Sequence, residues 1–549
     1  MDGDKIKNKN LTRFYSLSEM LISAFAVISI FTLFLTQLTW PLEPDQGFYS
    51  LTGMMILEGY KPYSDIWMIK GPLIPYLYAL ILKIFGNVQW AVHLFDITLA
   101  TIGMTAIWYI IRKITNKFYA FVITPCLITT YHENPFMSSQ PDGWVIMLLS
   151  IMIAFLFYDE GRLNKSTSVL TGILISLIGA IKFPYLIYSS IIILYAALYY
   201  KEEKIRAFKF LLISALVAIT ITSLSFLWLY YIGSLEEMFD LLFGYLPDSH
   251  FSEKTKFIDI IYSTYLIAIR GSGIYAFFLA IPGLALLFFS HRKLFYLIST
   301  WGAIALLLII IQNKIFSLYV LHIFPAIYIF ASYAIYRMSK PLAIITCILI
   351  ISVTFNKYWQ KDIYSAYKFA TKQTPSEEYY HSFSYSVFEK GNKTILNIAD
   401  HIKNNISEGR TIYSTDYILT VHLLSNTLTA TKFANYLPLM FSNGERKIRY
   451  EKQLEKDLLT NKPQFIIYPY IPNLKGDAFK LTRYLTEVTR KVMHSHYHID
   501  KVIDNFVIFK HHELNMCFEE YGFFMYRFTR FIHDVKNDKF NRRKNWKVK

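Results

Sequence analysis

Two charged side chains near the first long apolar run have the types needed for group-transfer chemistry. Asp45 follows that run at once, behind prolines that fix the direction of the chain, and Lys70 stands before Gly71. A well-placed carboxylate can act as a general base, which contributes about 10²–10⁴-fold to a rate, and an ammonium group can stabilise a negatively charged leaving group. Charge at membrane depth is costly and commonly serves binding or catalysis. The alternative is an ordinary extracytoplasmic loop with solvated charges, in which Asp45 only caps a helix over 46–58.

A second acid and a second lysine lie farther along the chain. Asp142 opens an apolar segment, a position where aspartate commonly caps a helix. Lys182 interrupts the apolar stretch 177–184, so its charge must either reach the membrane surface along its own side chain or meet an anion. Helix capping and surface exposure are therefore the alternatives to a role for these two residues in a site.

Tyr319 and His322 lie three positions apart in the apolar stretch 318–325, so a helix would place them on one face. Both side chains can form hydrogen bonds to a polar ligand. A histidine that bonds a neighbouring helix for structural reasons is the alternative.

The other histidines and the cysteines give no support to a metal site. Three of the histidines alternate along one segment and would share one face of a strand, for which an exposed strand is the simpler explanation. Two cysteines lie in apolar runs and the third stands alone, so neither a zinc site nor a disulfide framework is expected. No cofactor is predicted, and a divalent metal has no support in the sequence. The residues concerned are His132, His250, His494, His496, His498, Cys126, Cys347 and Cys517.

The composition is that of a polytopic membrane protein. Of the 549 residues, 54% are hydrophobic, which is more than soluble domains contain. The 44 phenylalanines and 42 tyrosines suit aromatic belts at two bilayer surfaces. A net charge of +16 comes with no nucleic-acid-binding motif, so cytoplasmic lysine and arginine are the simpler source and no nucleic-acid partner is expected.

Eleven apolar segments approach the roughly 20 residues that a helix needs to cross a bilayer. The first is too long for a signal-peptide core and lacks a small-residue cleavage site, which indicates an uncleaved anchor. The apolar segment 72–85 is predicted to be a short helix lying in the interface. The predicted spans are 17–40, 91–111, 118–131, 142–158, 168–181, 184–200, 210–232, 273–290, 294–311, 318–336 and 341–355.

The distribution of positive charge predicts the orientation. With the N-terminus in the cytoplasm, the cytoplasmic segments up to residue 340 hold 17 lysines and arginines, against 8 in the opposite loops. An odd number of spans then places the C-terminal part outside. The sequence therefore predicts a multi-pass protein of the plasma (inner) membrane, with an extracytoplasmic C-terminal domain.

Composition changes near residue 356, where polar helical patterns and short β-rich runs begin. Helices are predicted over 392–405 and 449–459, and strands over 411–413, 464–468 and 505–509. We expect two domains, a transmembrane domain over residues 1–355 and an extracytoplasmic α/β domain over residues 356–549. The basic, aromatic tail 521–549 would lie on an anionic membrane surface or extend as a solvated tail.

Four short motifs in the first extracytoplasmic loop resemble a known family. In order they are 45–49 (Asp-Gln-Gly-Phe-Tyr), 56–59 (Ile-Leu-Glu-Gly), 63–67 (Tyr-Ser-Asp-Ile-Trp) and 70–72 (Lys-Gly-Pro). Together they are similar to the first loop of polyprenyl-phosphate-sugar-dependent glycosyltransferases of the GT-C type, which include protein mannosyltransferases and aminoarabinose transferases. The resemblance covers about residues 15–355, and it implies an α-helical membrane fold that is often followed by a small module.

The resemblance also implies roles for the charged residues. Asp45 matches the family's key acid and would be the base, and Asp142 would orient the acceptor or support that base. Gln46 departs from the pattern, because the family usually has a second acid after the first. Asp65 would support the site. The residues implied to bind the donor phosphate are Lys70, Lys182, Tyr319 and His322.

The predicted function is that of an integral-membrane glycosyltransferase that moves a sugar from a polyprenyl-phosphate donor to an acceptor hydroxyl on the extracytoplasmic face. The family implies inversion at the anomeric carbon, and a lipid, a glycan or a protein could be the acceptor. A transporter or flippase of lipid-linked substrates is the alternative, but its usual signature of interrupted helices in repeated halves is missing from the sequence. A non-catalytic scaffold would give Asp45, Lys70 and Lys182 no common purpose.

Overall fold

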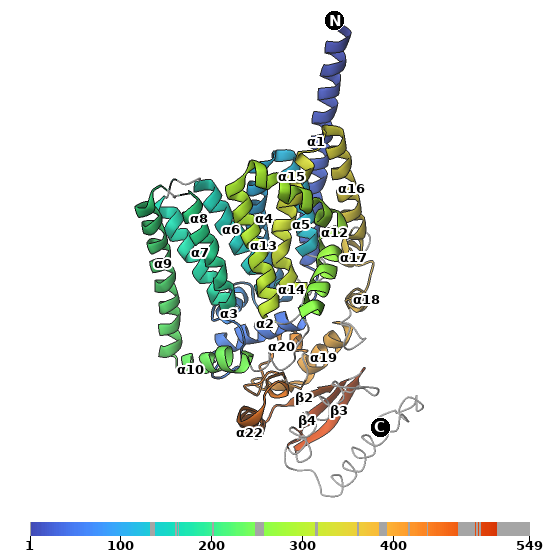
Figure 1. The fold of residues 1–549 in the computed structure, drawn as a ribbon. Coiled ribbons are helices and arrows are strands. Elements are labelled where there is room, and N and C mark those ends of the chain that lie inside the picture. The colour runs from blue at the N-terminus through green and yellow to red at the C-terminus, as the bar shows by residue number, and fades with distance from the viewer. Residues whose placement is uncertain are drawn as a thin grey trace. The chain divides into compact units, whose positions relative to one another are not determined.

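The computed structural model shows a largely α-helical protein with one small β-sheet (Figure 1). Several residues discussed above lie outside the described part of the chain, namely His132, His250, His494, Cys517 and the tail 521–549. The structure describes residues 2–131, 138–159, 162, 164–199, 202–247, 257–312, 317–358, 362–383, 392–415, 418–435, 437–469, 489, 492, 496–504 and 506–512.

Helices make up most of the described chain, and short 3-10 or π-helical turns (η) join some of them. The helical elements before residue 246 are α1 (Asp2–Gln37), α2 (Pro44–Leu57), α3 (Leu73–Phe85), α4 (Gln89–Ile114), α5 (Lys117–Tyr131), α6 (Pro141–Asp159), α7 (Lys165–Ile181), η1 (Phe183–Tyr188), α8 (Ser189–Tyr199), α9 (Lys204–Tyr231), α10 (Leu235–Phe239) and η2 (Asp240–Tyr245). Those that follow are α12 (Phe257–Ser290), α13 (Arg292–Gln312), α14 (Ser317–Val320), η3 (Leu321–Ile323), α15 (Phe324–Tyr336), α16 (Lys340–Tyr358), α17 (Tyr364–Ala370), α18 (Ser376–His381), α19 (Asn392–Asn405), α20 (Thr420–Ser425), α21 (Leu437–Met440) and α22 (Gly444–Asn461).

Seven segments of the described chain are long and apolar enough to cross a membrane, and each coincides with a predicted span. The other four predicted spans fall on α5, on α7, on the η1–α8 pair and on the shorter apolar stretch Lys340–Thr354 of α16. The segment predicted to lie in the interface is the 13-residue helix α3. The seven are Ser16–Gln37, Gln89–Ile114, Pro141–Asp159, Lys204–Tyr231, Gly273–Ser290, Arg292–Gln312 and Leu318–Tyr336.

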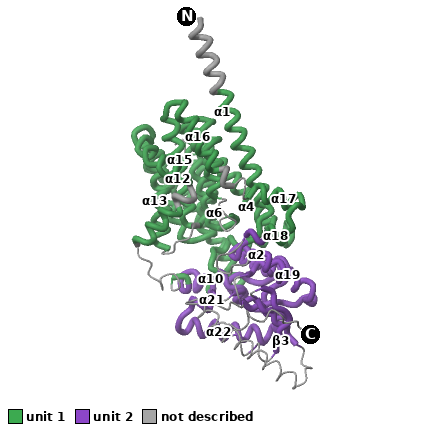
Figure 2. The backbone as a smooth tube through the Cα atoms, turned by 90° about the vertical axis from the view of Figure 1, so that its right-hand side faces the viewer, with its two compact units in different colours: residues 1–42, 69–236, 246–379 green, residues 43–68, 237–245, 380–549 purple. Residues whose placement is uncertain are grey.

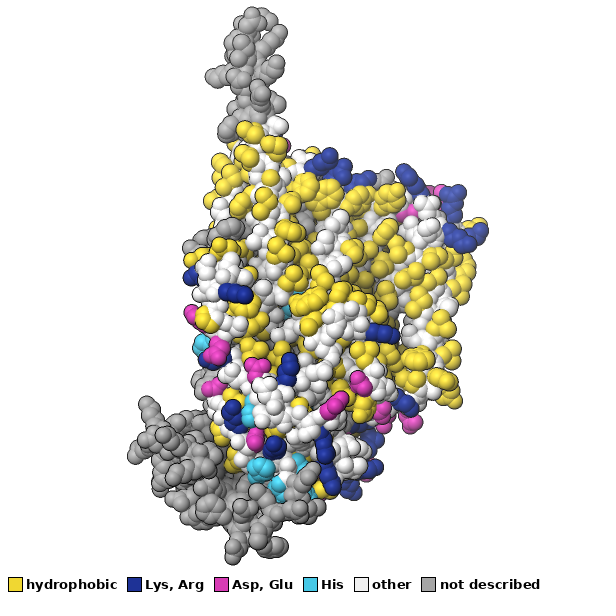
Figure 3. All heavy atoms as spheres, turned by 180° about the vertical axis from the view of Figure 1, so that it is seen from behind, with side chains coloured by type: hydrophobic (Ala, Val, Ile, Leu, Met, Phe, Trp, Pro, Cys, Tyr) yellow, Lys and Arg dark blue, Asp and Glu magenta, His cyan; other side chains and the backbone are white. Residues whose placement is uncertain are grey.

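Apolar side chains cover much of the outer surface of these helices. On α9, for example, Leu216, Ile219 and Leu227 are more than half exposed. Figure 3 shows hydrophobic side chains over a broad band of one face, with lysines and arginines gathered along an edge of that band. A soluble protein rarely exposes so large an apolar area, whereas lipid tails accept it. The surface thus agrees with a polytopic membrane protein.

The chain forms two compact units (Figure 2). The first comprises residues 1–42, 69–236 and 246–379, and the second comprises residues 43–68, 237–245 and 380–549. A domain boundary near residue 355 stays a prediction from the sequence. The second unit includes α2, so part of the first loop belongs to the same compact body as the C-terminal fold.

A four-stranded sheet in the order β1-β2-β4-β3 forms the centre of the second unit. The first two strands of this order are parallel, with Ile412 beside Phe465, and the other pairs are antiparallel. Three of the strands lie where the sequence predicts them, and β3 adds an edge strand. The strands are β1 (Ile412–Ser414), β2 (Phe465–Pro469), β3 (Tyr497–Ile503) and β4 (Phe506–His511).

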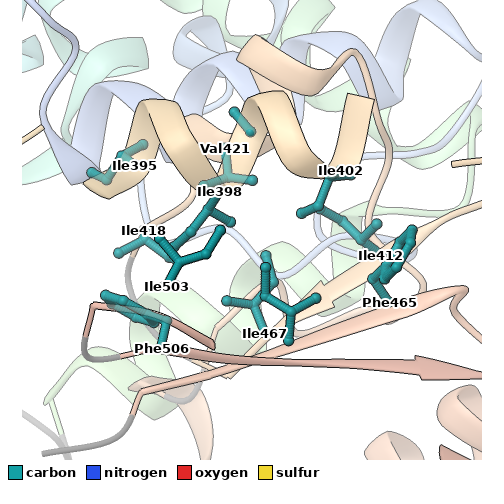
Figure 4. Close-up of a cluster of buried hydrophobic side chains, with 12 residues drawn as sticks. Ile395, Ile398, Ile402, Ile412, Ile418, Val421, Phe465, Ile467, Ile503 and Phe506 are labelled. Atoms are coloured by element: carbon teal, nitrogen blue, oxygen red, sulfur yellow. The ribbon is translucent and has the colours of Figure 1, made fainter. Parts of the chain in front are cut away.

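The core of the second unit forms between this sheet and α19 (Figure 4). α19 has the bounds that the sequence predicts, because Ile395, Ile398 and Ile402 recur at helical spacing and face the strands. They pack with Ile467 of β2 and with Phe506 of β4. α22 covers the predicted helix 449–459 and extends it at both ends.

Candidate active site

The loop that carries Lys70 passes directly against the end of α7. The Gly71 N–H donates a hydrogen bond to the carbonyl oxygen of Ile181 at 2.9 Å. A Cβ atom at Gly71 would lie 2.2 Å from the carbonyl oxygen of Ala180, so only glycine allows this approach. Because Lys182 follows at once, two lysines that are far apart in the sequence are held on adjacent backbone segments.

Lys182 stands at a break between two helical elements. α7 ends before it, its own backbone is extended (φ −159°), and η1 begins after it with a proline in its first turn. The side chain is only 14% exposed, so the charge stays inside the protein. The Lys182 side chain therefore does not extend to the surface, as the alternative from the sequence would require.

Asp142 and Lys182 form a buried ion pair. Lys182 Nζ lies 3.0 Å from Asp142 Oδ1, and the Asp142 side chain is 1% exposed. The Tyr185 hydroxyl also donates to Asp142 Oδ1, and Lys182 donates a second hydrogen bond to Gln312 Oε1 at 2.7 Å. Lys70 also acts electrostatically on the Asp142 carboxylate. Asp142 therefore does more than cap α6.

Aromatic rings enclose the Lys182 ammonium. Nζ lies 4.3 Å from the ring centroid of Tyr319 and 5.0 Å from that of Tyr185. Cation–π contacts of this length favour a charge that has left water. Tyr319, predicted from the sequence to bind phosphate, thus lies beside the predicted cation.

His322 lies in a stack of tyrosine rings next to this cluster. Its ring stacks on Tyr185 with centroids 4.6 Å apart, and its Nδ1 lies 3.1 Å from the Tyr188 hydroxyl. A structural histidine, the alternative to a ligand-binding one, would form such a bond to a neighbouring element. Its Nε2, however, is buried and has no hydrogen-bond partner among the described residues. This nitrogen is therefore available to a ligand.

Sequence reasoning did not find Tyr185, Tyr188 or Gln312. Gln312 is a polar residue at the end of a long apolar helix, which is a detectable signal. The two tyrosines give no comparable signal, because 42 tyrosines are spread along the chain. Only the contacts between helices distinguish them.

Asp96, another residue that sequence reasoning missed, anchors the start of α6. It is fully buried in α4 and accepts hydrogen bonds from Gln37 Nε2 at 2.7 Å, the Tyr131 hydroxyl at 2.7 Å and Trp144 Nε1 at 2.8 Å. Trp144 is two residues after Asp142, so this network fixes the turn that presents Asp142. An acid within a predicted span is a recognisable signal.

His93 supports the same region from one turn earlier in α4. Its Nδ1 lies 3.0 Å from the Ser139 hydroxyl oxygen and its Nε2 lies 3.0 Å from the carbonyl oxygen of Trp40. Both nitrogens are therefore occupied, and the ring joins the segment before α6 to the end of the first span. Its role is structural.

Asp45 belongs to the second unit, in the first turn of α2. The helix cap is Glu43, which forms a capping box with Gln46, whose side-chain oxygen accepts the Glu43 N–H at 2.8 Å. Burial, followed by the nearby charge of Asp45, raises the pKa of the Glu43 carboxyl well above its ordinary value. The alternative in which Asp45 itself caps the helix is therefore not what the structure contains.

Asp65 closes a turn in the same loop. Its carboxylate accepts the Lys61 N–H at 2.8 Å, and its own N–H donates to the Lys61 carbonyl oxygen at 3.0 Å. Within this turn, the fully buried Tyr63 has a positive φ of 68°, a backbone angle that residues other than glycine rarely adopt. Such a conformation persists only where the surroundings enforce it. The turn is thus a rigid part of the second unit.

No group of three or more histidine, cysteine, aspartate or glutamate side chains that could hold a metal ion occurs in the part of the chain that the structure describes. The charged site of the first unit therefore consists of an acid, two lysines, tyrosines, an amide and a histidine. Such a set can bind an anion and orient a hydroxyl.

Part of the chain resembles a known protein family. The profile of a family described as dolichyl-phosphate-mannose-protein mannosyltransferase matches residues 69–228, a segment that contains Lys70, Asp142 and Lys182. The chain matches none of the curated proteins with which it was compared.

Solved structures of two proteins have a similar fold. ArnT from Cupriavidus metallidurans bound to undecaprenyl phosphate is 12% identical, with a TM-score of 0.60 over 89% of this chain and 97% of that one. The same protein in the apo state gives a TM-score of 0.61 over the same shares, also at 12% identity. The Archaeoglobus fulgidus oligosaccharyltransferase in the apo form is 11% identical, with a TM-score of 0.50 over 91% of this chain and 75% of that one.

These likenesses extend over about nine-tenths of the chain, which includes its helical spans. The expectation of a polytopic α-helical membrane fold of the GT-C type is confirmed. The chain therefore has a fold similar to that of these proteins, and its residues 69–228 resemble the mannosyltransferase family.

Proposed function

We propose that this protein is an integral-membrane glycosyltransferase that moves a sugar from a polyprenyl-phosphate donor to an acceptor hydroxyl on the extracytoplasmic face. One observation carries the proposal: a lysine that is almost enclosed by protein is paired with a buried aspartate, and the segment that carries a second lysine passes next to it. The lipid phosphates named with ArnT and the mannosyltransferase family support this substrate class.

Lys70 and Lys182 bind the donor phosphate in this proposal. The close approach of Gly71 holds the backbone segments of both lysines next to each other, and both lysines act electrostatically on Asp142. Positive groups that are already in place when phosphate charge develops stabilise a transition state without reorganisation. Tyr319 and the unpartnered Nε2 of His322 supply further hydrogen bonds to the phosphate or to the sugar.

Asp45 is the proposed general base. The acceptor oxygen attacks the anomeric carbon and forms the new C–O bond, while the bond from that carbon to the phosphate oxygen breaks and its electron pair leaves with the phosphate. The acceptor proton passes to the Asp45 carboxylate. Attack opposite the leaving group gives inversion. Asp142 orients the acceptor or supports the base, and Asp65 supports the loop.

We further propose the predicted topology for this enzyme, with the N-terminus in the cytoplasm and the protein in the plasma membrane. Residues 1–355 would be the catalytic transmembrane part and residues 356–549 an extracytoplasmic α/β domain. The acceptor would be a lipid, a glycan or a protein. The excess of lysine and arginine in the predicted cytoplasmic segments supports this orientation.

Transfer from radiolabelled polyprenyl-phosphate sugars, measured with the protein reconstituted in vesicles, tests the proposal. Asp45→Asn should lower transfer at least about 100-fold with normal folding, since general-base catalysis contributes that much. Lys70→Ala should raise the KM for the donor, whereas Lys209→Ala, which removes an exposed lysine from α9, should leave it unchanged. Full transfer by Asp45→Asn would remove the base assignment. A substrate gradient built by the purified protein, without transfer, would favour the transporter alternative.

A further inference from the structure

α2, the helix that carries Asp45, packs on the C-terminal fold through a contact that only glycine permits. A Cβ atom at Gly47 would lie 2.4 Å from Thr420 Oγ1 and 2.6 Å from the Thr420 backbone nitrogen. These distances are too short for any real side chain, so the backbone of α2 touches α20 directly. Gly47 is two residues after Asp45, and the contact therefore fixes the turn that presents the carboxylate.

The far end of the same loop is also attached to the C-terminal fold. The Trp67 N–H donates a hydrogen bond to the carbonyl oxygen of Lys432 at 2.9 Å. The Trp67 ring meets Tyr245 edge-on, with centroids 5.3 Å apart, and packs against Phe48 of α2 at 6.3 Å. The loop 43–68 is thus held at both ends.

Residues 237–245, which come from a second loop, also contact the C-terminal fold. Asp240 accepts hydrogen bonds from Arg446 at 2.9 Å and from Arg449 at 2.8 Å. Burial alone would raise the pKa of Asp240, but the hydrogen bonds and charges of both arginines outweigh it and lower that pKa. Lys432 Nζ lies 3.0 Å from Glu237. Figure 2 shows these segments as parts of the second unit.

We propose that the C-terminal α/β fold is the frame that positions the base of the transfer reaction, with Gly47 and Thr420 as the positioning residues. Its catalytic consequence rests on the proposed function, in which Asp45 is that base. Small errors in the placement of a reacting group, about 1 Å, can cost on the order of 100-fold in rate. The C-terminal fold then contributes to turnover although it supplies no reacting group.

Hydrogen exchange tests the mechanical part of the proposal without reference to activity. Ile467→Ala removes a fully buried side chain from the core of the second unit, in the full-length protein. Exchange in α2 should then accelerate together with exchange in α19, while α4 and α6 keep their protection. Loss of protection in α19 with unchanged protection in α2 would overturn the proposal. If Ile467→Ala does not fold, Ile467→Val provides the same comparison with a smaller perturbation.

Kinetics test the catalytic part. Gly47→Ala should lower kcat at least tenfold with the KM for the lipid donor unchanged, because the donor lysines belong to the other unit. Ser50→Ala is the matched control on the same helix, since the buried Ser50 hydroxyl has no partner among the described residues. Equal kcat values for Gly47→Ala and Ser50→Ala would overturn the positioning role. Full activity of Asp45→Asn would instead refute the base assignment and leave the exchange result to decide whether the frame exists.

Discussion

Lys182 Nζ lies 3.0 Å from Asp142 Oδ1 inside the helical unit, and neither side chain has more than 14% of its surface exposed. In a low-dielectric interior, each charge is tolerable only because the other is present. The pair therefore contributes to folding as well as to the proposed chemistry, and the two contributions can be separated by experiment.

Neutralising one partner of this pair should destabilise the protein more than neutralising both. Asp142→Asn and Lys182→Gln should each cost about 3–5 kcal/mol, because each leaves an uncompensated buried charge. The double variant should lose clearly less than the sum of the two. Unfolding of the purified protein in detergent measures all three. Additive losses would show that the two charges do not depend on each other.

Removal of the Tyr185 hydroxyl should lower both the stability of the protein and its transfer activity. Tyr185→Phe deletes the hydrogen bond to Asp142 and keeps the ring stacked on His322. Because the acceptor is charged, the expected loss of stability is about 1.5–3 kcal/mol, and transfer should fall with it. Tyr195→Phe, which deletes a longer hydrogen bond of 3.3 Å to Asp159, should reduce stability less and leave transfer unchanged. Equal transfer by the two variants would contradict this prediction.

The approach of Gly71 to α7 predicts a large difference between two alanine substitutions. Gly71→Ala places a Cβ 2.2 Å from a backbone oxygen, so one segment must move, at a cost of about 1–3 kcal/mol and with loss of donor affinity. Gly302→Ala in α13 meets only Ala326 at 3.6 Å, an ordinary contact. It should be neutral or stabilise by up to about 1 kcal/mol. Thermal unfolding and donor titration of both variants provide the comparison, and similar behaviour would refute the close approach.

Acid should destabilise the second unit through His422. Burial lowers the pKa of this fully buried histidine to about 4, against a smaller opposing effect of its bond to the Thr427 carbonyl. His422 binds a proton near pH 6.5 in the unfolded chain and near pH 4 in the folded chain. The contribution of the neutral His422 to the free energy of unfolding is therefore complete above pH 6.5 and is lost as the pH falls toward 4. The loss at pH 5 is about 2 kcal/mol.

Unfolding of the wild type and of His422→Gln at pH 7.5 and pH 5 isolates this effect. The wild type should lose more stability on acidification than the variant, whose neutral amide does not titrate. Asp240 also responds to acid, but it is present in both proteins and cancels in the comparison. An equal loss in both proteins would exclude His422 as the cause.

Hydropathy and helical periodicity predict most of the fold, because both depend on neighbouring residues. The apolar stripe of α19 gives its bounds, and the long apolar runs give the spans. The membership of α2 in the C-terminal unit was not predicted, since it depends on the contact between Gly47 and Thr420, far apart in the sequence. Periodicity carries no information about such contacts.

Several residues of the site were predictable because a polar or charged side chain stands in or beside an apolar run. Lys182 interrupts an apolar stretch, whereas Asp142 opens one and was singled out by the family resemblance, and the two form an ion pair. Asp96 carried the same signal and was overlooked, although its hydrogen bonds hold the start of α6. Tyr185 could not have been found, because its role depends on Asp142, which lies on a different helix.

The close passage of Gly71 over Ala180 has a consequence for redesign. An engineered change that lengthens or shortens either of the two segments would break the contact that holds Lys70 and Lys182 on adjacent parts of the backbone. Residues 69–72 and 180–183 should therefore be exchanged together. Chimaeras with relatives should keep activity only when both segments come from the same parent protein.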